Sequence, residues 1–301
     1  MNIVLKRIFI APLLALMLTG CWDSNKDESG HESEYFIGTK GSIIFDSYPP
    51  FSSRPIKVFY NIPAGGNRST MPILFAMHGV DRNAEDYLNA WEVASNNKKF
   101  IVIAPEFSTA NFPGSSNYNL GGMFNGPNLK PEAEWTFSLI EALFDFAVAD
   151  LGSNQEVYDI WGHSAGGQFV HRYVLFKPNS RINRAVAANS GWYTITDFDV
   201  AFPYGLGSSP ATSVTLGDSF KQRLVVQLGT ADTNTNDPNL EHNANVDAQG
   251  LTRFARGTFF WNVANGKKTG HPVFNWTKRE VAGVAHEYKK MATDAALLLY
   301  N

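Results

Sequence analysis

The sequence predicts an α/β fold in which helices cover both faces of a mostly parallel β-sheet. Short apolar runs rich in β-branched and aromatic residues alternate with segments of helical periodicity along most of the chain. Two of these runs, residues 72–77 and 100–104, are almost continuously apolar, as expected of strands buried on both faces. With 44% hydrophobic and 18% charged residues, the chain has a globular composition, and its 301 residues fit one large domain as well as two small ones.

The first residues have the organisation of a targeting segment. Two basic residues precede an apolar run over residues 8–18 that is too short to span a bilayer comfortably. The run ends in Leu-Thr-Gly-Cys, and Cys21 is the only cysteine of the chain. This ending resembles a bacterial lipobox, which implies that residues 1–20 are a signal peptide and that Cys21 is lipidated. The alternatives are a plain secretory signal with an incidental cysteine, or an uncleaved anchor.

The segment that starts at the cysteine, residues 21–34, is polar and charged and has no periodicity. We expect it to be a flexible tether between the lipid and a single domain over residues 35–301. The lipobox resemblance then implies a protein of the bacterial cell envelope, anchored to a membrane on its extracytoplasmic side. A net charge of −3 and a pI near 6.2 give no reason to expect a nucleic acid partner.

The first part of the predicted sheet comes from five runs. Strands are expected over residues 35–38, 42–45, 55–60, 72–77 and 100–104. A helix is expected between the last two of these, with Asn83 as its N-cap and Asp86 as a weaker capping partner. The following residues 108–130 are rich in glycine, asparagine and aromatic residues and have no strand or helix pattern. Loops of this length are usually functional or mobile.

Strands and helices also alternate through the second half of the chain. A helix that starts near Pro131 carries apolar residues on two faces, so we expect it to be largely buried. Further helices are expected after Ser164, over residues 247–264 and at the C-terminus. The remaining predicted strands cover residues 157–161, 184–189, 224–228 and 274–281.

The strand at residues 157–161 passes directly into a helix through Gly162-His163-Ser164-Ala165-Gly166. In a nucleophile elbow, a serine lies on a strained turn between strand and helix, with its hydroxyl exposed. Glycines two residues before and after the serine place no Cβ where the strand and the helix crowd together. The helix directs its N-terminal dipole and free N–H groups at the reacting atoms. The short motif alone is weak evidence, and the flanking strand and helix are what favour a nucleophile over an ordinary turn.

Polar residues with complementary chemistry lie at the ends of the predicted strands. His78-Gly79 and Asp232 each follow a predicted strand, and His286 precedes the last predicted helix. The carboxyl ends of parallel strands meet at one edge of the sheet, where such folds place their active sites. A nucleophilic serine needs a base, the base needs a carboxylate that orients it, and the oxyanion needs backbone donors. The order Ser164, Asp232, His286 supplies the first three of these groups.

In these segments the chain resembles the α/β-hydrolase superfamily, and residues 74–107 are similar to its polyhydroxybutyrate-depolymerase and feruloyl-esterase-like branch. The resemblance implies the α/β-hydrolase fold, with a mostly parallel eight-stranded sheet and helices on both faces. It also implies Ser164 as the nucleophile, His286 as the general base and then acid, and Asp232 as the orienting carboxylate.

The resemblance further implies an oxyanion hole made by the backbone N–H groups of Ala165 and Val80. Asp237, in the same loop as the expected triad acid, stays an alternative for that role. Two other histidines are expected to be structural, His78 as a brace for the oxyanion loop and His163 as a packing residue that points elsewhere. We expect no metal and no organic cofactor, because the Asp/Asn-rich loop lacks the glycine and the closing glutamate of a calcium loop.

An acyl-serine mechanism with water as the acceptor predicts a serine esterase, and the expected substrate is a small-molecule or polymer-derived carboxylic ester. Trp192, Tyr193 and Tyr204 are candidates for an aromatic pocket wall that would suit apolar or aryl esters; alternatively, they are core residues. Two other functions stay open. One is a different hydrolase on the same scaffold, such as a polyester depolymerase, lactonase or peptidase. The other is a non-catalytic, surface-binding lipoprotein.

Overall fold

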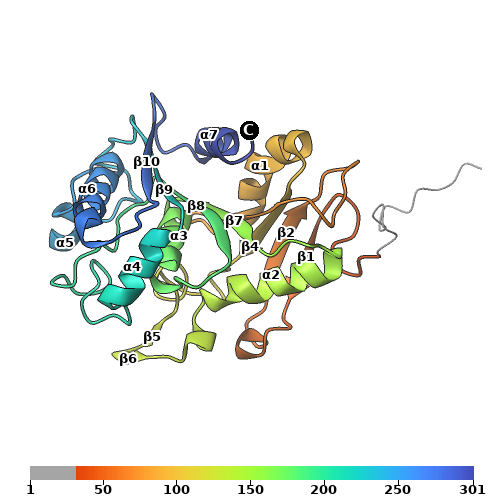
Figure 1. The fold of residues 1–301 in the computed structure, drawn as a ribbon, viewed down its shortest axis with the longest axis horizontal. Coiled ribbons are helices and arrows are strands. Elements are labelled where there is room, and N and C mark those ends of the chain that lie inside the picture. The colour runs from red at the N-terminus through yellow and green to blue at the C-terminus, as the bar shows by residue number, and fades with distance from the viewer. Residues whose placement is uncertain (1–31) are drawn as a thin grey trace, which may run out of the picture.

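The computed structural model describes residues 32–301, which fold around one eight-stranded β-sheet (Figure 1). The strand order is β1-β2-β4-β3-β7-β8-β9-β10. β2 runs antiparallel to β1 and β4, and all other neighbouring strands are parallel, so the predicted mostly parallel sheet is confirmed. The strands are β1 (Lys40–Phe45), β2 (Ile56–Asn61), β3 (Ile73–Met77), β4 (Ile101–Glu106), β7 (Tyr158–His163), β8 (Ile182–Ala188), β9 (Leu224–Gly229) and β10 (Thr277–Val281).

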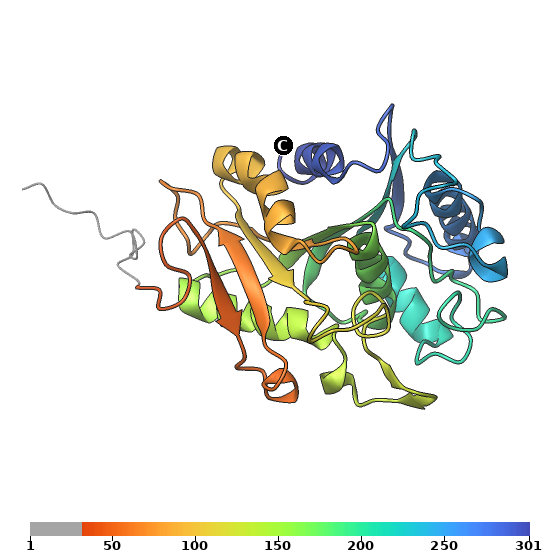
Figure 2. The same cartoon turned by 180° about the vertical axis from the view of Figure 1, so that it is seen from behind.

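Helices cover both faces of this sheet, as predicted. One layer contains α1 (Ala84–Lys98) and α7 (Tyr288–Leu299). The other layer contains α2 (Ser138–Leu151), α3 (Ala165–Phe176), α4 (Ser213–Lys221) and α6 (Arg253–Gly266), with the short α5 (Ala244–Asp247) before α6. In both views of the molecule, α1 and α7 lie above the sheet and α2 lies below it (Figures 1 and 2).

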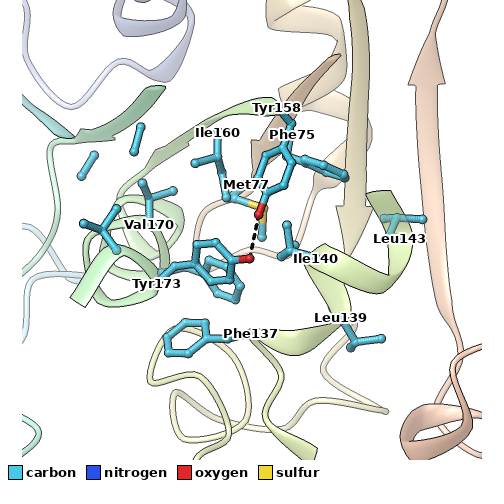
Figure 3. Packing of buried hydrophobic residues seen from close by; sticks show 14 of the residues in the cluster. Phe75, Met77, Phe137, Leu139, Ile140, Leu143, Tyr158, Ile160, Val170 and Tyr173 are labelled. Atoms are coloured by element: carbon cyan, nitrogen blue, oxygen red, sulfur yellow. Dashed lines mark hydrogen bonds between the residues drawn. The ribbon is translucent and has the colours of Figure 1, made fainter. Parts of the chain in front are cut away.

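Each face of the sheet has its own apolar core because successive side chains of a strand point to opposite faces. Phe75 and Met77 of β3 face α2 and α3, whereas Leu74 and Ala76 face α1 and α7. All residues of β3 are buried, which explains why its sequence is continuously apolar. Figure 3 shows Phe75 and Met77 among the apolar residues of α2 and α3.

The predicted strand over residues 35–38 is wrong. The backbone N–H groups of residues 34–36 donate to the carboxylate of Asp150, near the end of α2, at 2.9 to 3.0 Å. These donors therefore have a side-chain acceptor instead of a neighbouring strand, and the first strand begins only at Lys40.

Two predicted helices begin or continue differently from the prediction. The helix expected from Pro131 starts as the 3-10 turn η2 (Glu132–Glu134), and α2 follows only at Ser138. The helix expected over residues 247–264 begins only with α6 at Arg253, because the turn at Gly250, with φ of 135°, separates α6 from α5, which ends at Asp247. The apolar faces that predicted the first of these helices are nevertheless largely buried in α2.

The connections contain short elements that the sequence patterns did not predict. The loop at residues 108–130 includes a two-stranded hairpin of β5 (Phe124–Asn125) and β6 (Asn128–Leu129). Asn83 lies at the N-cap position of α1, but its amide donates to the Asp86 carboxylate at 2.8 Å, and its side chain accepts no backbone hydrogen bond. Two further 3-10 turns are η1 (Pro49–Phe51) and η3 (Lys268–Gly270).

The predicted targeting segment is not part of the described structure. The expected signal peptide over residues 1–20, Cys21 and most of the expected tether lie outside the described residues. Among residues 32–301, no helix has the length and the apolar character that a membrane span requires.

Candidate active site

Ser164 lies on a strained turn between β7 and α3. Its backbone has φ of 57° and ψ of −118°, a combination that residues with a side chain rarely adopt. A Cβ added at Gly162 would lie 2.3 Å from the carbonyl oxygen of Gly166, and one added at Gly166 would lie 2.1 Å from that of Met77. The close approach of strand and helix therefore requires both glycines, as the sequence predicted.

His286 and Asp232 meet beside this turn. Nδ1 of His286 lies 2.7 Å from Oδ2 of Asp232, and the Asp232 side chain is 2% exposed. The alternative carboxylate, Asp237, is turned to Arg253, whose Nη1 lies 3.0 Å from its Oδ2. The geometry thus pairs His286 with Asp232 and not with Asp237.

Ser164 and His286 line the same cleft, which has a volume of about 230 Å³. Within residues 32–301, no hydrogen bond joins the Ser164 hydroxyl to the His286 ring. Such bonds are often long in enzymes without substrate and shorten in the substrate complex. The site therefore contains a partly exposed serine in the same cleft as a histidine that a buried carboxylate orients.

His78 holds the loop that follows β3. Its Nδ1 donates to the carbonyl oxygen of Gly79 at 2.9 Å, and its Nε2 accepts the N–H of Phe107 at 3.0 Å. Burial lowers the pKa of His78 to about 3, so the ring is neutral and has the tautomer that these two bonds require. A Cβ added at Gly79 would lie 3.9 Å from Cβ of Ser164, so the braced loop lies directly beside the serine.

The two expected oxyanion donors border Ser164. Ala165 is the first residue of α3, where backbone N–H groups have no partner within the helix. Val80 is 50% exposed and lines the clefts on both sides of Ser164. Their role as oxyanion donors stays a prediction.

A second cleft, of about 290 Å³, opens on the other side of Ser164. It shares Val80, Ser164 and Asn239 with the first cleft. The rest of its wall combines the polar side chains of Arg82, Ser115, Asn119, Gln168 and Glu241 with the rings of Tyr118 and Trp192. The clefts therefore extend from Ser164 in two directions. Their lining includes more polar side chains than the predicted aromatic pocket wall would have.

The predicted aromatic wall is largely wrong. Trp192 lines the second cleft, and Cζ of Arg172 lies over its ring, 4.2 Å from the centroid. Tyr193 is fully buried and stacks on Phe260, with ring centroids 4.6 Å apart. Tyr204 packs against Trp192, with ring centroids 5.0 Å apart, and lines neither cleft.

His163 packs against the site instead of pointing elsewhere. The ring centroids of His163 and His286 are 4.3 Å apart, and Nδ1 of His163 lies 3.3 Å from the hydroxyl of Tyr87. Burial, together with the nearby charges of His286 and Arg253, lowers the pKa of His163 well below its ordinary value. His163 is therefore a neutral ring that supports one face of His286.

Two residues that position the site were not predicted. The side chain of Asn189 accepts the N–H of Gly229 at 2.7 Å and donates to the carbonyl oxygen of Ala285 at 3.0 Å. It thereby joins the loops that carry the candidate acid and base. Asn189 directly follows β8, so its position at the carboxyl end of a strand was a usable signal. Arg253, at the start of α6, belongs to no recognisable motif.

No group of three or more His, Cys, Asp or Glu side chains within the described range is placed to hold a metal ion. The Asp/Asn-rich loop after β9 uses its side chains in local turns. Oδ1 of Asn234 accepts the N–H of Asn236 at 2.9 Å, and Oδ1 of Asp237 accepts that of Asn239 at 2.8 Å. These Asx turns account for the spacing of Asp and Asn in this loop.

Comparison with known proteins adds to this geometry. No protein-family model and no curated protein matches the chain. Among solved structures, poly(aspartic acid) hydrolase-1 from Sphingomonas sp. KT-1 has 38% sequence identity and a TM-score of 0.83, over 87% of this chain and 99% of that chain. LpqC, a poly(3-hydroxybutyrate) depolymerase from Bordetella parapertussis, has 29% identity and a TM-score of 0.82, over 87% and 89% of the two chains.

More distant structures share the fold. The S-formylglutathione hydrolase FrmB from Staphylococcus aureus has 14% identity and a TM-score of 0.56, over 87% of this chain and 98% of that chain. A strand, a strained serine turn and a helix at the carboxyl edge of such a sheet define the α/β-hydrolase class. The chain belongs to the α/β-hydrolase superfamily, in its polyhydroxybutyrate-depolymerase-like branch, as its sequence resemblance implied, and it is a hydrolase.

Proposed function

We propose that this hydrolase cleaves carboxylic esters, with Ser164 as the nucleophile, His286 as the general base and then acid, and Asp232 as the orienting carboxylate. One observation carries the proposal: the strained serine shares a cleft with a histidine whose Nδ1 lies 2.7 Å from a buried carboxylate. That contact fixes the ring and leaves Nε2 as the nitrogen that takes the serine proton.

The reaction proceeds through an acyl-serine intermediate. Oγ of Ser164 attacks the ester carbonyl while His286 accepts the hydroxyl proton. The backbone N–H groups of Ala165 and Val80 stabilise the negative oxygen of the tetrahedral intermediate. His286 then protonates the departing alcohol, and water releases the acyl group by the same steps with His286 again as the base.

We assign the leaving group and the acyl group of the ester to different clefts. His286 lines only the first cleft, so the leaving group, which receives a proton from this histidine, belongs there. Ala165 lines only the second cleft, which therefore holds the acyl group next to the oxyanion donors. Because several polar side chains line the second cleft, we expect acyl groups with hydrogen-bonding substituents to be preferred over plain alkyl chains.

Hydrolysis of p-nitrophenyl esters of increasing acyl length, with and without polar substituents, tests the proposal. We expect turnover by the wild type and a loss of about a thousandfold or more in Ser164→Ala. A fluorophosphonate should label the wild type and not the variant. Turnover that survives in Ser164→Ala would discard this nucleophile. A wild type that neither turns over nor is labelled would favour the non-catalytic binding protein.

A second candidate function is the hydrolysis of a polymer, either poly(aspartic acid) or a polyester. The 38% identity to a poly(aspartic acid) hydrolase supports it, as does a cleft that continues on both sides of the nucleophile. A polymer cut within its chain needs space in both directions. Incubation with poly(aspartic acid) and poly(3-hydroxybutyrate), followed by size-exclusion chromatography, would show shortening that is lost in Ser164→Ala. Turnover of small esters without shortening of either polymer would exclude this candidate.

We also propose that Cys21 is lipidated after removal of residues 1–20, which tethers the enzyme to the extracytoplasmic side of a bacterial membrane. A single cysteine at the end of a signal-like segment supports this proposal. In a bacterial host, the full-length protein should incorporate an alkynyl fatty acid and sediment with membranes, whereas Cys21→Ser should incorporate none. An unlabelled wild type in the soluble fraction would contradict lipidation.

A further inference from the structure

A buried arginine lies behind the proposed triad. Arg253 is 1% exposed, and its Nη1 lies 3.6 Å from Oδ1 of Asp232 and 3.0 Å from Oδ2 of Asp237. The other carboxylate oxygen of Asp232 contacts His286. The four side chains therefore form a row in the order Asp237, Arg253, Asp232 and His286. Once the imidazole is protonated, the charges along this row alternate in sign.

We propose that Arg253 and Asp237 are positioning residues that set the pH range in which His286 acts as a base. This inference rests on the proposed serine mechanism. Arg253 shares the carboxylate of Asp232, so it weakens the attraction of that carboxylate for an imidazolium. Asp237 offsets part of the Arg253 charge. The pair therefore keeps His286 neutral at a lower pH than Asp232 alone would allow, while the ring stays oriented.

Burial makes this row sensitive to the loss of a single charge. Arg253 and Asp232 are 1% and 2% exposed, so water and salt screen their interaction weakly. Within residues 32–301, Nε and Nη2 of Arg253 have no hydrogen-bond partner, so Nη1 makes its contacts with the two carboxylates. The hydrogen bond from Arg253 lowers the pKa of Asp237, which keeps Asp237 charged at neutral pH.

The other titratable groups around His286 do not change between the variants compared below. They are His163, Tyr87, Tyr288, Asp81 and Glu287. Burial keeps His163 and Tyr87 neutral, since it lowers the pKa of the histidine and raises that of the tyrosine. Burial also raises the pKa of Tyr288, and the carboxylates of Asp81 and Glu287 are exposed to solvent. A shift between variants therefore reports on Arg253 and Asp237.

The test is the pH dependence of kcat/KM for a p-nitrophenyl ester. Arg253→Gln removes a positive charge and stabilises the imidazolium, so the acid limb should move up by about 0.5 to 1 pH unit. Asp237→Asn leaves the Arg253 charge uncompensated, so the limb should move down by a similar amount. The double variant leaves Asp232 alone with His286, so its limb should lie between those of the two single variants and slightly above that of the wild type. General loosening of the site does not produce shifts of opposite sign in the two single variants.

Three controls keep the inference falsifiable. Arg253→Lys keeps the charge and should leave the limb in place, and the single-variant shifts should persist at high salt. Asp237 is 21% exposed, so Asp237→Asn carries the test if Arg253→Gln does not fold. The inference would be overturned if the acid limb stayed in place, or moved in the same direction, in both single variants. If Ser164→Ala is inactive at the same time, the proposed serine mechanism is unaffected by that result. Full activity in Ser164→Ala would overturn the inference together with the proposed function.

Discussion

Ser164 keeps its strained backbone because the chain around it has no room to relax. The missing side chain of Gly166 lets the first turn of α3 approach the end of β3, where an added Cβ would lie 2.1 Å from the carbonyl oxygen of Met77 and 2.7 Å from that of His78. A residue in a sparsely populated conformation persists only where its surroundings fix it in this way. At the residue scale, the strained turn at Ser164 thus depends on the absence of a Cβ at Gly166.

Gly166→Ala should therefore cost both activity and stability. The new methyl group forces α3 away from β3, and overpacking of this kind costs about 1 to 3 kcal/mol of the free energy of unfolding. We expect ester turnover to fall by about tenfold or more, measured beside the midpoint of urea unfolding. Gly270→Ala is the matched control, because a Cβ there meets nothing within 4 Å. A Gly166→Ala enzyme as active and stable as the control would contradict this account of the turn.

The sequence predicted those candidate site residues that lie next to a recognisable strand or helix. Ser164, Asp232 and His286 follow or precede elements with clear apolar patterns, so their position at one edge of the sheet followed from the fold class. Tyr193 was assigned wrongly because its role depends on side-chain direction, which an irregular loop does not reveal. Arg253 was missed because its contacts depend on how α6 approaches the loop after β9.

At the scale of elements, the loops after β8, β9 and β10 are joined by shared hydrogen bonds. Asn189 bonds to Gly229 and Ala285, and the N–H of Ala231 donates to the carbonyl oxygen of Val284 at 3.0 Å. The loops that carry Asp232 and His286, the candidate acid and base, thus hold each other in place. Apolar runs in the sequence predicted these strands. The start of the helix near Pro131 was predicted too early, because hydrogen bonds within local turns determine where that helix begins.

Asn189→Gly should separate the loops without disturbing the backbone of this residue. Glycine tolerates the φ of 43° at position 189, so the variant removes only the two side-chain hydrogen bonds. Misplacement of a catalytic group by about 1 Å costs roughly a hundredfold, so we expect kcat/KM to fall by about ten- to a hundredfold.

Asn183→Ala is the control for this variant. It removes the hydrogen bond of 3.1 Å to Asp159 at the opposite end of β8 and should leave kcat/KM unchanged. Equal losses in both variants would show that β8 is generally weakened and that Asn189 has no special place in the site.

At the scale of the whole molecule, the fold encloses three histidines that stay neutral. His78, His163 and His171 are at most 2% exposed, and burial lowers the pKa of each well below the ordinary value of 6.5. His171 donates from Nδ1 to the carbonyl oxygen of Gly167 at 3.0 Å and accepts the N–H of Thr194 at 3.1 Å on Nε2. A protonated ring would lose the second of these bonds, as it would at His78.

These histidines should make the folded chain sensitive to mild acid. Below pH 6.5 the unfolded chain takes up protons that the folded chain does not, so the free energy of unfolding falls as the pH falls towards the folded pKa, about 3 for His78. Each histidine contributes up to about 1.4 kcal/mol per pH unit. In urea unfolding between pH 6 and 4.5, His171→Gln should show a slope shallower by about 1 kcal/mol per pH unit. Between pH 7 and 8 the slopes should agree. A variant with the wild-type slope in acid would show that His171 takes up its proton without unfolding.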